Sequence, residues 1–478
     1  MATEKKLMKK NLKICCIGAG FVGGPTMAVI ALKCPEIKIT VVDINKDKID
    51  SWNGNINKLP VYEPGLSEII EKVRDVNLFF STDIDNAIDE SEMIFMAVNT
   101  PTKTSGEGKG YAADLTYVKK SAEQIAKASK SDKIIIEKST LPVRTAEKIK
   151  EILDANKTKD INFEVLSNPE FLAEGTAIQD LFKSDRVLIG GENTKTGKHA
   201  ISLLFNIYNQ WIPKEKILTT NVWSSELSKL VSNAMLAQRI SSINSISAVC
   251  EETGADIEEV AKAVGMDTRI GNKFLKSSIG FGGSCFKKDI LNLVYISRYH
   301  GLNEVADYWE SVVKINNYQT KRIGDKIIKA LDSEKNNNVV AILGWAFKKD
   351  TNDSRESASI YLAKQLLDNN IKINIYDPKV SKARIINDLA LLFKSYNKND
   401  SEVTYLLSKV SIVSNPYHAF LNVSVISLCT EWDSFVKLDW NKIYSIMNQP
   451  SFIFDGRGIL NMSDLSKIGF QTYSIGKS

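Results

Sequence analysis

The stretch GAGFVG at residues 18–23 decides the fold of the first part of this chain. It directly follows the apolar, strand-like run Leu12–Ile17 and opens an apolar helix. In the G-x-G-x-x-G spacing, Gly18 permits a tight turn, Gly20 lets the backbone approach a pyrophosphate, and Gly23 allows close helix–strand packing. Pyrophosphate oxygens would accept hydrogen bonds from backbone N–H groups at the helix N-terminus. The stretch therefore predicts a Rossmann-like unit that binds a dinucleotide.

The next strand-like run, Ile37–Val42, is followed at once by Asp43, twenty residues after Gly23. An acidic residue at this point accepts a hydrogen bond from a ribose 2′-hydroxyl and repels a 2′-phosphate, so NAD is favoured over NADP. A glycine pattern alone could be no more than a tight turn. The strand, the helix and Asp43 together indicate NAD binding.

Strand-like and helical segments divide the chain into three parts. Short β-branched runs alternate with helical stretches at both ends, which favours βαβ units and doubly wound parallel sheets. Long helical stretches such as Ser224–Thr253 dominate between them, and the polar stretch Asp332–Asn338 suggests a boundary loop. We expect an α/β protein with two Rossmann-like doubly wound domains joined by a long-helix connector, over residues 1–220, 221–330 and 331–478. The strand-like runs are Leu12–Ile17, Ile37–Val42, Met93–Val98, Ile134–Glu137, Phe163–Leu166, Val187–Ile189, Val339–Leu343, Ile371–Tyr376, Val423–Leu428 and Phe452–Phe454.

The composition argues against several classes of protein. A hydrophobic content of 43%, a charged content of 25% and a net charge of +5 are ordinary, and the basic residues do not form the clustered face typical of nucleic-acid binding. The six cysteines show no CxxC spacing and the three histidines lie far apart, so no metal site is predicted. No apolar run reaches the ~18 residues of a membrane helix. We expect a cytoplasmic protein with no nucleic-acid or membrane partner, and a solvated tail at Lys5–Lys10.

Cys285 lies in the glycine-rich stretch GFGGSCFKKD at residues 280–289. We expect Ser284 to cap a helix that holds Cys285 in its first turn, where the helix dipole lowers the pKa of a thiol. A nucleophilic cysteine beside a nicotinamide indicates a covalent thiohemiacetal and thioester, and hence oxidation to a carboxylic acid. The alternative is a buried structural cysteine after a glycine turn.

Two loops, Val98–Thr102 and Glu137–Val143, follow strand-like runs at the sheet edge where doubly wound folds bind ligands. Each could be an ordinary strand-to-helix turn, because Thr, Asn and Pro are common turn residues. The stretch Asn168–Gly175 offers two carboxylates, Glu170 and Glu174, which would share a helix face and be available for proton transfer. Exposed glutamates in a first helical turn are the alternative.

Polar groups recur at helical spacing in two further places. Glu226, Lys229 and Asn233 lie at i, i+3 and i+7, so one helix face presents a lysine and an amide that could stabilise an oxyanion. A solvated polar face is the alternative. Asp289 lies four residues after Cys285, and it suits water activation better than thiol activation, because a nearby anion raises the pKa of a thiol.

The last part of the chain places cations on loops that follow strand-like runs. Lys348 follows Val339–Leu343, and Arg457 follows Phe452–Phe454. Two phosphates of a nucleotide need such charges, and arginine binds them with a fork-like geometry. Because this part contains no second G-x-G-x-x-G, it indicates that the substrate itself is a nucleotide conjugate.

Several motifs together resemble the UDP-glucose/GDP-mannose dehydrogenase family, from about Leu12 to about Ile475. The resemblance implies NAD-dependent, four-electron oxidation of UDP-glucose to UDP-glucuronate through a cysteine thiohemiacetal and a thioester, which water hydrolyses. A sibling activity on GDP-mannose or a UDP-N-acetyl-hexosamine and an inactive NAD-binding scaffold are the alternatives. The motifs are GAGFVGGP at Gly18–Pro25, YEPGL at Tyr62–Leu66, VNTPTKT at Val98–Thr104, SNPEFLAEGTA at Ser167–Ala177, SSELSKL at Ser224–Leu230, GFGGSCF at Gly280–Phe286, FKKDTNDSRESAS at Phe347–Ser359 and FDGRG at Phe454–Gly458.

The resemblance implies catalytic roles for six residues at matching positions. Cys285 would capture the aldehyde as a nucleophile, while Lys229 and Asn233 would stabilise oxygen charge. Glu170 would be the general base of thioester hydrolysis. Thr140 and Asp289 would hold the water.

The resemblance also implies contacts with both ligands. The implied NAD contacts are Gly18, Ala19, Gly20, Phe21, Val22, Gly23, Asp43, Lys48, Val98, Asn99, Thr100, Pro101, Thr102, Leu141, Glu174 and Arg355. The implied UDP-glucose contacts are Glu170, Phe171, Leu172, Ala173, Glu174, Lys229, Asn233, Arg269, Lys276, Ser277, Ser278, Ile279, Gly280, Phe281, Gly282, Lys348 and Arg457.

Arg269 resembles an arginine that reaches the substrate of a neighbouring subunit, which implies a homodimer at least, with a hexamer as the alternative. Three positions depart from the family pattern. Lys48 stands where an arginine near the adenosine is usual. Lys287 replaces an expected glutamine and could lower the pKa of the Cys285 thiol. Tyr111 replaces an expected arginine, which leaves higher assembly open.

Overall fold

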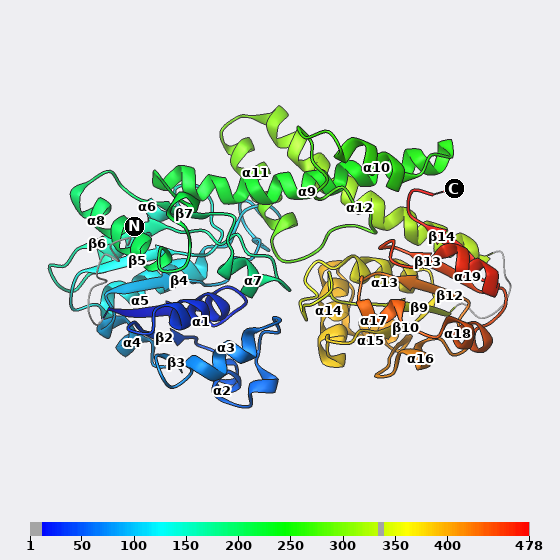
Figure 1. The fold of residues 1–478 in the computed structure, drawn as a ribbon, viewed down its shortest axis with the longest axis horizontal. Helices are drawn as coiled ribbons and strands as arrows, with labels where there is room; N and C mark the ends of the chain where they lie inside the picture. The colour runs from blue at the N-terminus through cyan, green and yellow to red at the C-terminus, as the bar shows by residue number, and fades with distance from the viewer. Residues whose placement is uncertain (1–11, 333–338, 478) are drawn as a thin grey trace, which may run out of the picture. The chain divides into compact units, whose positions relative to one another are not determined.

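The computed structural model describes residues 12–332 and 339–477, which form two compact units (Figure 1). The tail expected at Lys5–Lys10 lies outside the described residues, and so does nearly all of the stretch Asp332–Asn338. The expected division into three segments stays a prediction. The first unit comprises Met1–Ser232 with Leu291–His300, and the second comprises Asn233–Ile290 with Gly301–Ser478.

The first unit is built on a sheet of eight strands: β1 (Lys13–Ile17), β2 (Lys38–Val42), β3 (Leu78–Ser81), β4 (Met93–Met96), β5 (Lys133–Glu137), β6 (Phe163–Ser167), β7 (Val187–Gly190) and β8 (Ile217–Thr220). The strands are ordered β3-β2-β1-β4-β5-β6-β7-β8. Neighbouring strands are parallel, except that β6 and β7 meet antiparallel at Ser167 and Gly190. With β1 inside the sheet and crossovers to both sides, this is the doubly wound arrangement that the sequence predicts.

Helices cover both faces of this sheet (Figure 1). They are α1 (Gly23–Lys33), α2 (Lys46–Asn53), α3 (Leu66–Val73), α4 (Ile84–Glu90), α5 (Thr116–Ala128), α6 (Thr145–Asn156), α7 (Ala177–Phe182) and α8 (Lys195–Tyr208), with 3-10 turns at Ile56–Lys58 and Lys214–Lys216. Ile14 and Cys16 of β1 enter one apolar layer with α1, α3 and α8, while Cys15 and Ile17 enter another with α4, α5 and α6. Because β1 is buried on both faces, it is a continuous apolar run that is visible in the sequence.

Four helices follow: α9 (Val222–Thr253), α10 (Ile257–Gly265), α11 (Phe286–Tyr299) and α12 (Asn303–Asp332). Two of them, α9 and α12, are the long helices predicted for the connector. Residues 222–232 of α9 and 291–299 of α11 belong to the first unit, and the rest of both helices to the second. Within the described ranges, no helix has the length and apolarity needed to cross a membrane.

The second unit contains a parallel sheet of six strands: β9 (Val339–Leu343), β10 (Lys372–Tyr376), β11 (Val410–Ile412), β12 (Val425–Leu428), β13 (Phe452–Asp455) and β14 (Gln471–Ser474). Its order, β11-β10-β9-β12-β13-β14, repeats the order of the first six strands of the first sheet. The two sheets therefore share a topology, although the sequence shows no internal repeat. The helices of this sheet are α13 (Ala358–Asp368), α14 (Lys382–Ser395), α15 (Asp400–Leu407), α16 (Pro416–Ala419), α17 (Asp433–Val436), α18 (Trp440–Ile446) and α19 (Met462–Ile468).

All ten strand-like runs of the sequence form strands, and four strands were not predicted. These four, β3, β8, β11 and β14, are the two edges of each sheet. The stretch Leu389–Tyr417, which the sequence left unassigned, contains the end of α14, all of α15 and β11, and the start of α16.

Glu251 of α9 ties the end of the chain to two helices of the second unit. Its carboxylate accepts hydrogen bonds from Arg322 Nη1 at 2.7 Å, Tyr473 Oη at 2.7 Å and the Gly476 N–H at 2.8 Å. Lys326 Nζ lies 2.9 Å from it. Burial alone would raise the pKa of Glu251, but these donors outweigh burial and lower it to about 2.

Candidate active site

The glycine-rich turn between β1 and α1 has the geometry that its sequence predicts. Gly18 has φ of +111°, and a Cβ there would lie 2.3 Å from the Ala97 carbonyl oxygen. A Cβ on Gly23 would lie 2.0 Å from the Gly18 carbonyl oxygen, so this glycine is needed for packing. Gly20 differs, because no described heavy atom lies within 4 Å of the position its Cβ would take. The space above Gly20 is thus open to a ligand.

The first turn of α1 fits a pyrophosphate. Its N-cap residue, Val22, makes no side-chain capping bond among the described residues, so N–H groups of the first turn lack a side-chain acceptor. Such N–H groups and the positive end of the helix dipole bind anions. The turn therefore fits the NAD pyrophosphate that the sequence predicts.

Asp43 at the end of β2 holds this turn in place. Its Oδ2 accepts a hydrogen bond from the Ala19 N–H at 3.0 Å and from Lys48 Nζ at 2.7 Å, and its Oδ1 accepts one from the Asn45 N–H at 3.0 Å. Burial alone would raise the pKa of Asp43, but the Lys48 ammonium and the backbone donors lower it. The aspartate is therefore ionised at neutral pH. Lys48 has the positive charge of the arginine that is usual at this position, and in this structure its ammonium forms an ion pair with Asp43.

The two predicted ligand loops after β4 and β5 hydrogen-bond to each other. Ser139 Oγ donates to the Val98 carbonyl at 2.7 Å, and Thr100 Oγ1 donates to the Thr140 carbonyl at 3.1 Å. Leu141 is buried beside them. Because β4 and β5 are adjacent and parallel, their carboxyl ends meet at one edge, and Thr140 lies at the loop predicted to contact NAD.

Glu170 sits in a buried polar network at the carboxyl end of β6. Its Oε2 lies 2.9 Å from Lys138 Nζ, and its Oε1 accepts hydrogen bonds from the N–H groups of Phe171 at 2.9 Å and Leu172 at 3.1 Å. Lys138 Nζ also donates to Asn168 Oδ1 at 3.0 Å. Burial alone would raise the pKa of Glu170, but Lys138 and the two backbone donors lower it. Glu170 is thus a carboxylate at neutral pH.

Two cations face the ring of Phe171. The Arg186 guanidinium lies 3.9 Å from the ring centroid and Lys229 Nζ lies 5.3 Å from it. Arg186 Nη2 also donates to Ser232 Oγ at 2.9 Å, so this arginine joins the stretch before β7 to α9. The structure therefore brings the predicted residues Phe171 and Lys229 together. Sequence reasoning missed Arg186 and the role of Lys138, because neither occupies a recognisable spacing with its partner.

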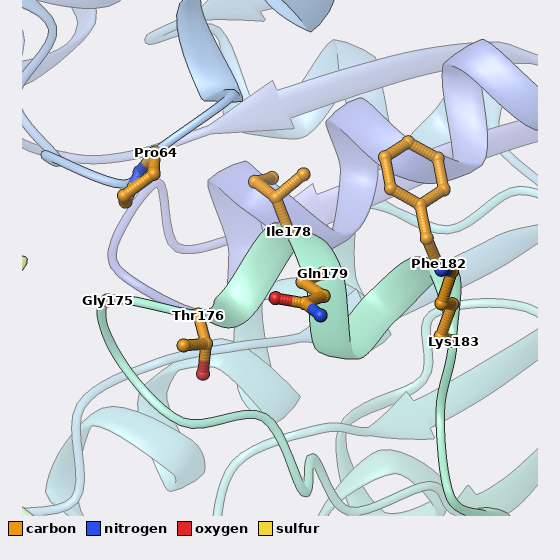
Figure 2. Close-up of a pocket in the computed structure, with 7 residues that line it drawn as sticks. All are labelled: Pro64, Gly175, Thr176, Ile178, Gln179, Phe182 and Lys183. Carbon is orange, nitrogen blue, oxygen red and sulfur yellow. The ribbon is translucent and has the colours of Figure 1, made fainter.

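A pocket of about 310 Å³ lies beside the end of the predicted substrate stretch (Figure 2). Glu63 binds the start of α7 there, accepting hydrogen bonds from the N–H groups of Gly175 at 2.7 Å and Ala177 at 3.2 Å. Figure 2 shows that the lining residues come from α7, from the residues directly before and after it, and from the loop that carries Pro64. They are Pro64, Gly175, Thr176, Ile178, Gln179, Phe182 and Lys183. Pro64, Gly175 and Thr176 lie in motifs that carry the family resemblance, whereas Ile178, Gln179, Phe182 and Lys183 lie outside them.

Cys285 immediately precedes α11 and is half-buried. The expectation that Ser284 caps the helix and that Cys285 lies in its first turn was wrong. The helix begins at Phe286, and the Cys285 carbonyl accepts the Asp289 N–H at 2.8 Å. The reason is that Gly283, with φ of +88°, keeps the chain in a turn up to Cys285. The thiol still lies at the positive end of the α11 dipole.

Asp289 and Asn233 lie next to each other in the second unit. Asn233 Nδ2 donates to Asp289 Oδ2 at 2.6 Å, and Lys288 Nζ lies 3.3 Å from Asp289 Oδ1. Asp289 is buried, one helical turn after Cys285. Three of the predicted catalytic residues therefore occupy one region of this unit.

The positive charge of Lys287, the residue that follows Cys285 by two positions, is paired with a carboxylate. Its Nζ donates to Glu356 Oε2 at 2.8 Å and to Tyr361 Oη at 3.0 Å. Burial alone would lower the pKa of Lys287, but Glu356 and Tyr361 raise it. The charge is consequently present and is balanced by Glu356, which weakens the expected effect on Cys285.

Side chains of α9 and α12 hold the predicted substrate loop Lys276–Gly282 in an extended path. Asn316 Oδ1 accepts the Phe281 N–H at 2.8 Å, while Asn316 Nδ2 donates to the Phe281 carbonyl at 3.0 Å. Gln319 Nε2 donates to the Ser278 carbonyl at 2.8 Å, and Asn244 Oδ1 accepts the Ser278 N–H at 2.8 Å. A backbone fixed by amide side chains in this way can present its remaining polar groups to a ligand.

The predicted cations of the second unit differ in their surroundings. Arg457 binds backbone carbonyl groups of the protein itself. Its Nε donates to the Cys429 carbonyl at 2.7 Å, and its Nη2 donates to the Phe347 carbonyl at 2.6 Å. Lys348 Nζ lies over the Phe347 ring at 5.7 Å. Arg355 pairs with Asp353, and the exposed Arg269 pairs with Asp267. Their ligand roles stay predictions.

The predicted site residues thus fall into two sets. Those in the first unit are the residues of the glycine turn (Gly18–Gly23), Asp43, Lys48, Val98–Thr102, Thr140, Leu141, Glu170–Glu174 and Lys229. Those in the second unit are Asn233, Arg269, Lys276–Gly282, Cys285, Asp289, Lys348, Arg355 and Arg457.

Models of three domains of one family match the chain in order. The description is UDP-glucose/GDP-mannose dehydrogenase family in each case, for the NAD binding domain at residues 12–212, the central domain at residues 223–318 and the UDP binding domain at residues 341–462.

Curated relatives and solved structures agree with these matches. The chain is 56% identical over 466 residues to a UDP-glucose 6-dehydrogenase of Drosophila melanogaster, which covers 98% of this chain and 96% of that one. It is 56% identical over 467 residues to one of Bos taurus, covering 97% of this chain and 93% of that one. The fold is similar to that of a UDP-glucose dehydrogenase from Pyrobaculum islandicum, with a TM-score of 0.81, 26% identity and 98% of both chains covered. A UDP-D-ManNAc dehydrogenase structure from Pyrococcus horikoshii has a TM-score of 0.78 at 21% identity, covers 98% of this chain and 99% of that one, and supports the fold alone.

Proposed function

This chain belongs to the UDP-glucose/GDP-mannose dehydrogenase family, and we propose on that basis that it oxidises UDP-glucose to UDP-glucuronate with NAD as the hydride acceptor. The observation that carries the four-electron outcome is Cys285 at the start of α11, one turn before the Asn233–Asp289 pair. A dehydrogenase that stops at an aldehyde has no use for a nucleophile there. The identity of the relatives named UDP-glucose 6-dehydrogenase supports UDP-glucose over other nucleotide sugars.

The reaction balances as two hydride transfers and one hydrolysis. Oxidation of the C6 alcohol gives an aldehyde, to which the Cys285 sulfur adds to form a thiohemiacetal. Removal of a second hydride from C6 gives a thioester. Water then breaks the carbon–sulfur bond, so that the carboxylate leaves and the thiol is restored. NAD would accept both hydrides when bound, and the glycine turn with the first turn of α1 would hold its pyrophosphate.

The polar residues have distinct proposed roles in these steps. Lys229 and Asn233 stabilise negative charge on the C6 oxygen. Glu170 accepts a proton from the attacking water, which Thr140 and Asp289 hold. Because Lys138 lowers the pKa of Glu170, this glutamate is a weaker base than an isolated one, and its contribution depends on orienting the water as well as on base strength.

Assembly is part of the same proposal. Arg269 is exposed, and its pairing with Asp267 involves a residue only two positions away. An arginine held at the surface by a local partner is available to a second copy of the chain. We therefore propose that the chain forms at least a homodimer, and that it is cytoplasmic. Light scattering, which measures the mass of the particle in solution, tests the assembly.

Counting NADH tests the activity. With limiting UDP-glucose and excess NAD, the proposal expects two NADH per sugar consumed and UDP-glucuronate as the product. A count of one would contradict the double oxidation. GDP-mannose and a UDP-N-acetyl-hexosamine are the matched controls, and a higher yield with either one would transfer the proposal to that substrate. An absence of NADH with all three sugars would favour an inactive NAD-binding protein.

A further inference from the structure

Lys138, which follows β5, is a buried cation whose ammonium group has three acceptors. The residue is 3% exposed. Its Nζ lies 2.9 Å from Glu170 Oε2, 3.0 Å from Asn168 Oδ1 and 3.2 Å from Tyr208 Oη. An ammonium group donates three hydrogen bonds, so the protein itself supplies an acceptor for each donor. These acceptors offset the cost of burying the charge.

The two neutral acceptors of Lys138 are fixed by further hydrogen bonds. Asn168 Nδ2 donates to the Leu188 carbonyl of β7 at 2.8 Å, and Tyr208 Oη donates to Asn168 Oδ1 at 2.7 Å. Tyr208 is the last residue of α8 and is buried. The ammonium group is therefore held by the end of β6 and by α8, and its position does not depend on Glu170.

Glu170 is the charged acceptor, and it is the member of the network that solvent can reach. Its side chain is 14% exposed. Its Oε1 accepts the N–H groups of Phe171 and Leu172, while Lys138 lies on Oε2. Donors on both oxygens fix the plane of the carboxylate. A water or a substrate can therefore approach Glu170, whereas the ammonium group of Lys138 acts on it only through the carboxylate.

The other groups that face this ion pair are neutral. Thr26 Oγ1 of α1 lies 3.5 Å from Glu170 Oε2. Burial raises the pKa of the Cys16 thiol of β1 and that of the Tyr208 phenol, so both keep their protons at neutral pH. Arg186 and Lys229 lie over the ring of the neighbouring Phe171. Within the described ranges, Lys138 is the cation that forms an ion pair with Glu170.

The contact keeps both members charged. Burial alone would raise the pKa of Glu170, but Lys138 and the two backbone donors lower it. Burial alone would lower the pKa of Lys138, but Glu170 and Tyr208 raise it. Without the ammonium group, burial would act on Glu170 against the backbone donors alone, and the carboxyl would keep its proton to a higher pH. A protonated carboxyl cannot accept a proton from water.

We propose that Lys138 is a positioning residue that keeps the carboxylate of Glu170 ionised and fixed in plane, and that it thereby sets the lower pH limit of thioester hydrolysis. This inference rests on the proposed function. In the hydrolysis, the oxygen of water bonds to C6, a water proton passes to Glu170, and the carbon–sulfur bond breaks with its electron pair leaving on the Cys285 sulfur. Lys138 gives up no proton and does not touch the substrate. The two oxidations precede this step and do not use Glu170.

Lys138→Met tests the charge, because it keeps an unbranched side chain and removes the ammonium group. Steady-state NADH formation at pH 7 should fall about 10-fold to 100-fold, part of what a general base contributes. It should recover toward about pH 9, the range in which a buried, unpaired glutamate ionises. Glu170→Gln, measured over the same pH range, gives the contribution of hydroxide alone. Below the raised pKa of Glu170, its smaller ionised fraction outweighs its greater strength as a base.

The first turnover of Lys138→Met separates the hydrolysis from the oxidations. Because both oxidations are intact, mixing with UDP-glucose and NAD at pH 7 should give a burst of two NADH per subunit. A thioester on Cys285 should then accumulate, and intact-protein mass spectrometry detects it. A variant damaged only in its packing would slow the oxidations as well and would show neither the burst nor the adduct.

Tyr208→Phe is the matched control, since it removes one acceptor of Lys138 and keeps both charges. It should lower the steady-state rate by about threefold, the loss of a neutral hydrogen bond, and leave the acidic limb of the pH profile where the parent has it. A limb of Lys138→Met that coincides with that of the parent would overturn the proposal. So would a missing burst, or an equal shift of the limb in Tyr208→Phe.

A melting experiment tests the ion pair without turnover and without a change at Lys138. The pKa of Glu170 is lowered in the folded chain, so its stabilising effect is complete above the ordinary value and is lost as the pH falls. The melting temperature of the parent minus that of Glu170→Gln should therefore decline below about pH 4.5. A difference that does not decline would overturn the proposal, even if Lys138→Met does not fold.

The two readouts also separate this inference from the proposed function. If the parent forms no NADH with any sugar but the melting difference declines in acid, the ion pair stands and the proposed function fails. If the parent forms two NADH per UDP-glucose but the limb of Lys138→Met does not move, the proposed function stands and the role of Lys138 fails.

Discussion

Gly20→Ala and Gly23→Ala form a matched pair that separates ligand binding from folding in the glycine turn. Each adds one methyl group, and the two glycines lie three residues apart. At Gly23 the added Cβ would lie 2.0 Å from the Gly18 carbonyl oxygen, 3.1 Å from Cys16 Sγ and 3.2 Å from Ala97 Cβ. At Gly20 it would meet no described heavy atom within 4 Å, and the φ there is not left-handed.

The expected free energies follow from these distances. A backbone oxygen at 2.0 Å cannot move aside as a flexible side chain can, so Gly23→Ala should lower the free energy of unfolding by about 3 kcal/mol, at the upper end for overpacking. Gly20→Ala should leave that free energy unchanged or raise it by about 0.4–1 kcal/mol, because alanine restricts the unfolded chain. Its methyl group would nevertheless occupy the space where a pyrophosphate approaches. NAD affinity should therefore fall at least tenfold, or about 1.4 kcal/mol.

Two measurements on each variant decide the outcome: the melting temperature without ligand, and the NAD dissociation constant by calorimetry. Gly20→Ala is expected to melt with the parent and bind NAD weakly, while Gly23→Ala melts early. A Gly20→Ala variant that binds NAD as tightly as the parent would refute the assignment of this turn to the pyrophosphate. Early melting of Gly20→Ala would instead show that the open space above Gly20 is filled by the protein itself.

Two further predictions concern the second unit. Cys285→Ser should stop steady-state NADH formation while NAD affinity stays within about twofold, and a normal rate in this variant would show that the cysteine is structural. Glu251→Gln should lower the free energy of unfolding at pH 7 by about 2–4 kcal/mol, because Arg322 and Lys326 lose a buried anion. Since the pKa of Glu251 is lowered from 4.5 to about 2, its stabilising effect is complete above the ordinary value and is lost as the pH falls. Urea unfolding at pH 7 and pH 4 should show a smaller difference between parent and Glu251→Gln at pH 4.

The strands that the sequence predicts and those it misses differ in position within the sheets. Every interior strand was predicted, whereas β3, β8, β11 and β14 all lie at edges. An interior strand of a parallel sheet is covered on both faces and reads as an apolar run, such as Val339–Leu343. An edge strand has one neighbour and more solvent, and β14 has the sequence Gln-Thr-Tyr-Ser. The apolar signal is therefore weakest where the sheet ends, and only the pairing with β13 defines β14.

The candidate site shows a similar division between local and long-range information. The glycine turn, Asp43 and the Cys285–Asp289 spacing are short-range patterns, and the sequence places them well. The cap of α6 is not short-range, because Glu226 reaches it from another helix. The position of Cys285 before α11, instead of within its first turn, depends on the turn at Gly283. A prediction of the helix start from the capping preference of Ser284 alone does not take the turn at Gly283 into account.

Glu137 and Glu170 show why burial alone does not define the chemistry of a carboxylate. They lie at the ends of the adjacent parallel strands β5 and β6, and burial would raise the pKa of both. Lys138 and two backbone N–H groups lower the pKa of Glu170, whereas burial and the charge of Glu226 raise the pKa of Glu137 well above its ordinary value. Glu137 and Lys138 are consecutive in sequence, and side chains of consecutive residues on an extended chain point to opposite faces. One strand end thus buries a carboxyl group on one side and directs a cation toward Glu170 on the other. The pKa values of the two buried carboxyl groups therefore shift in opposite directions, because, of the two, Glu170 has the cation and the backbone N–H donors beside it.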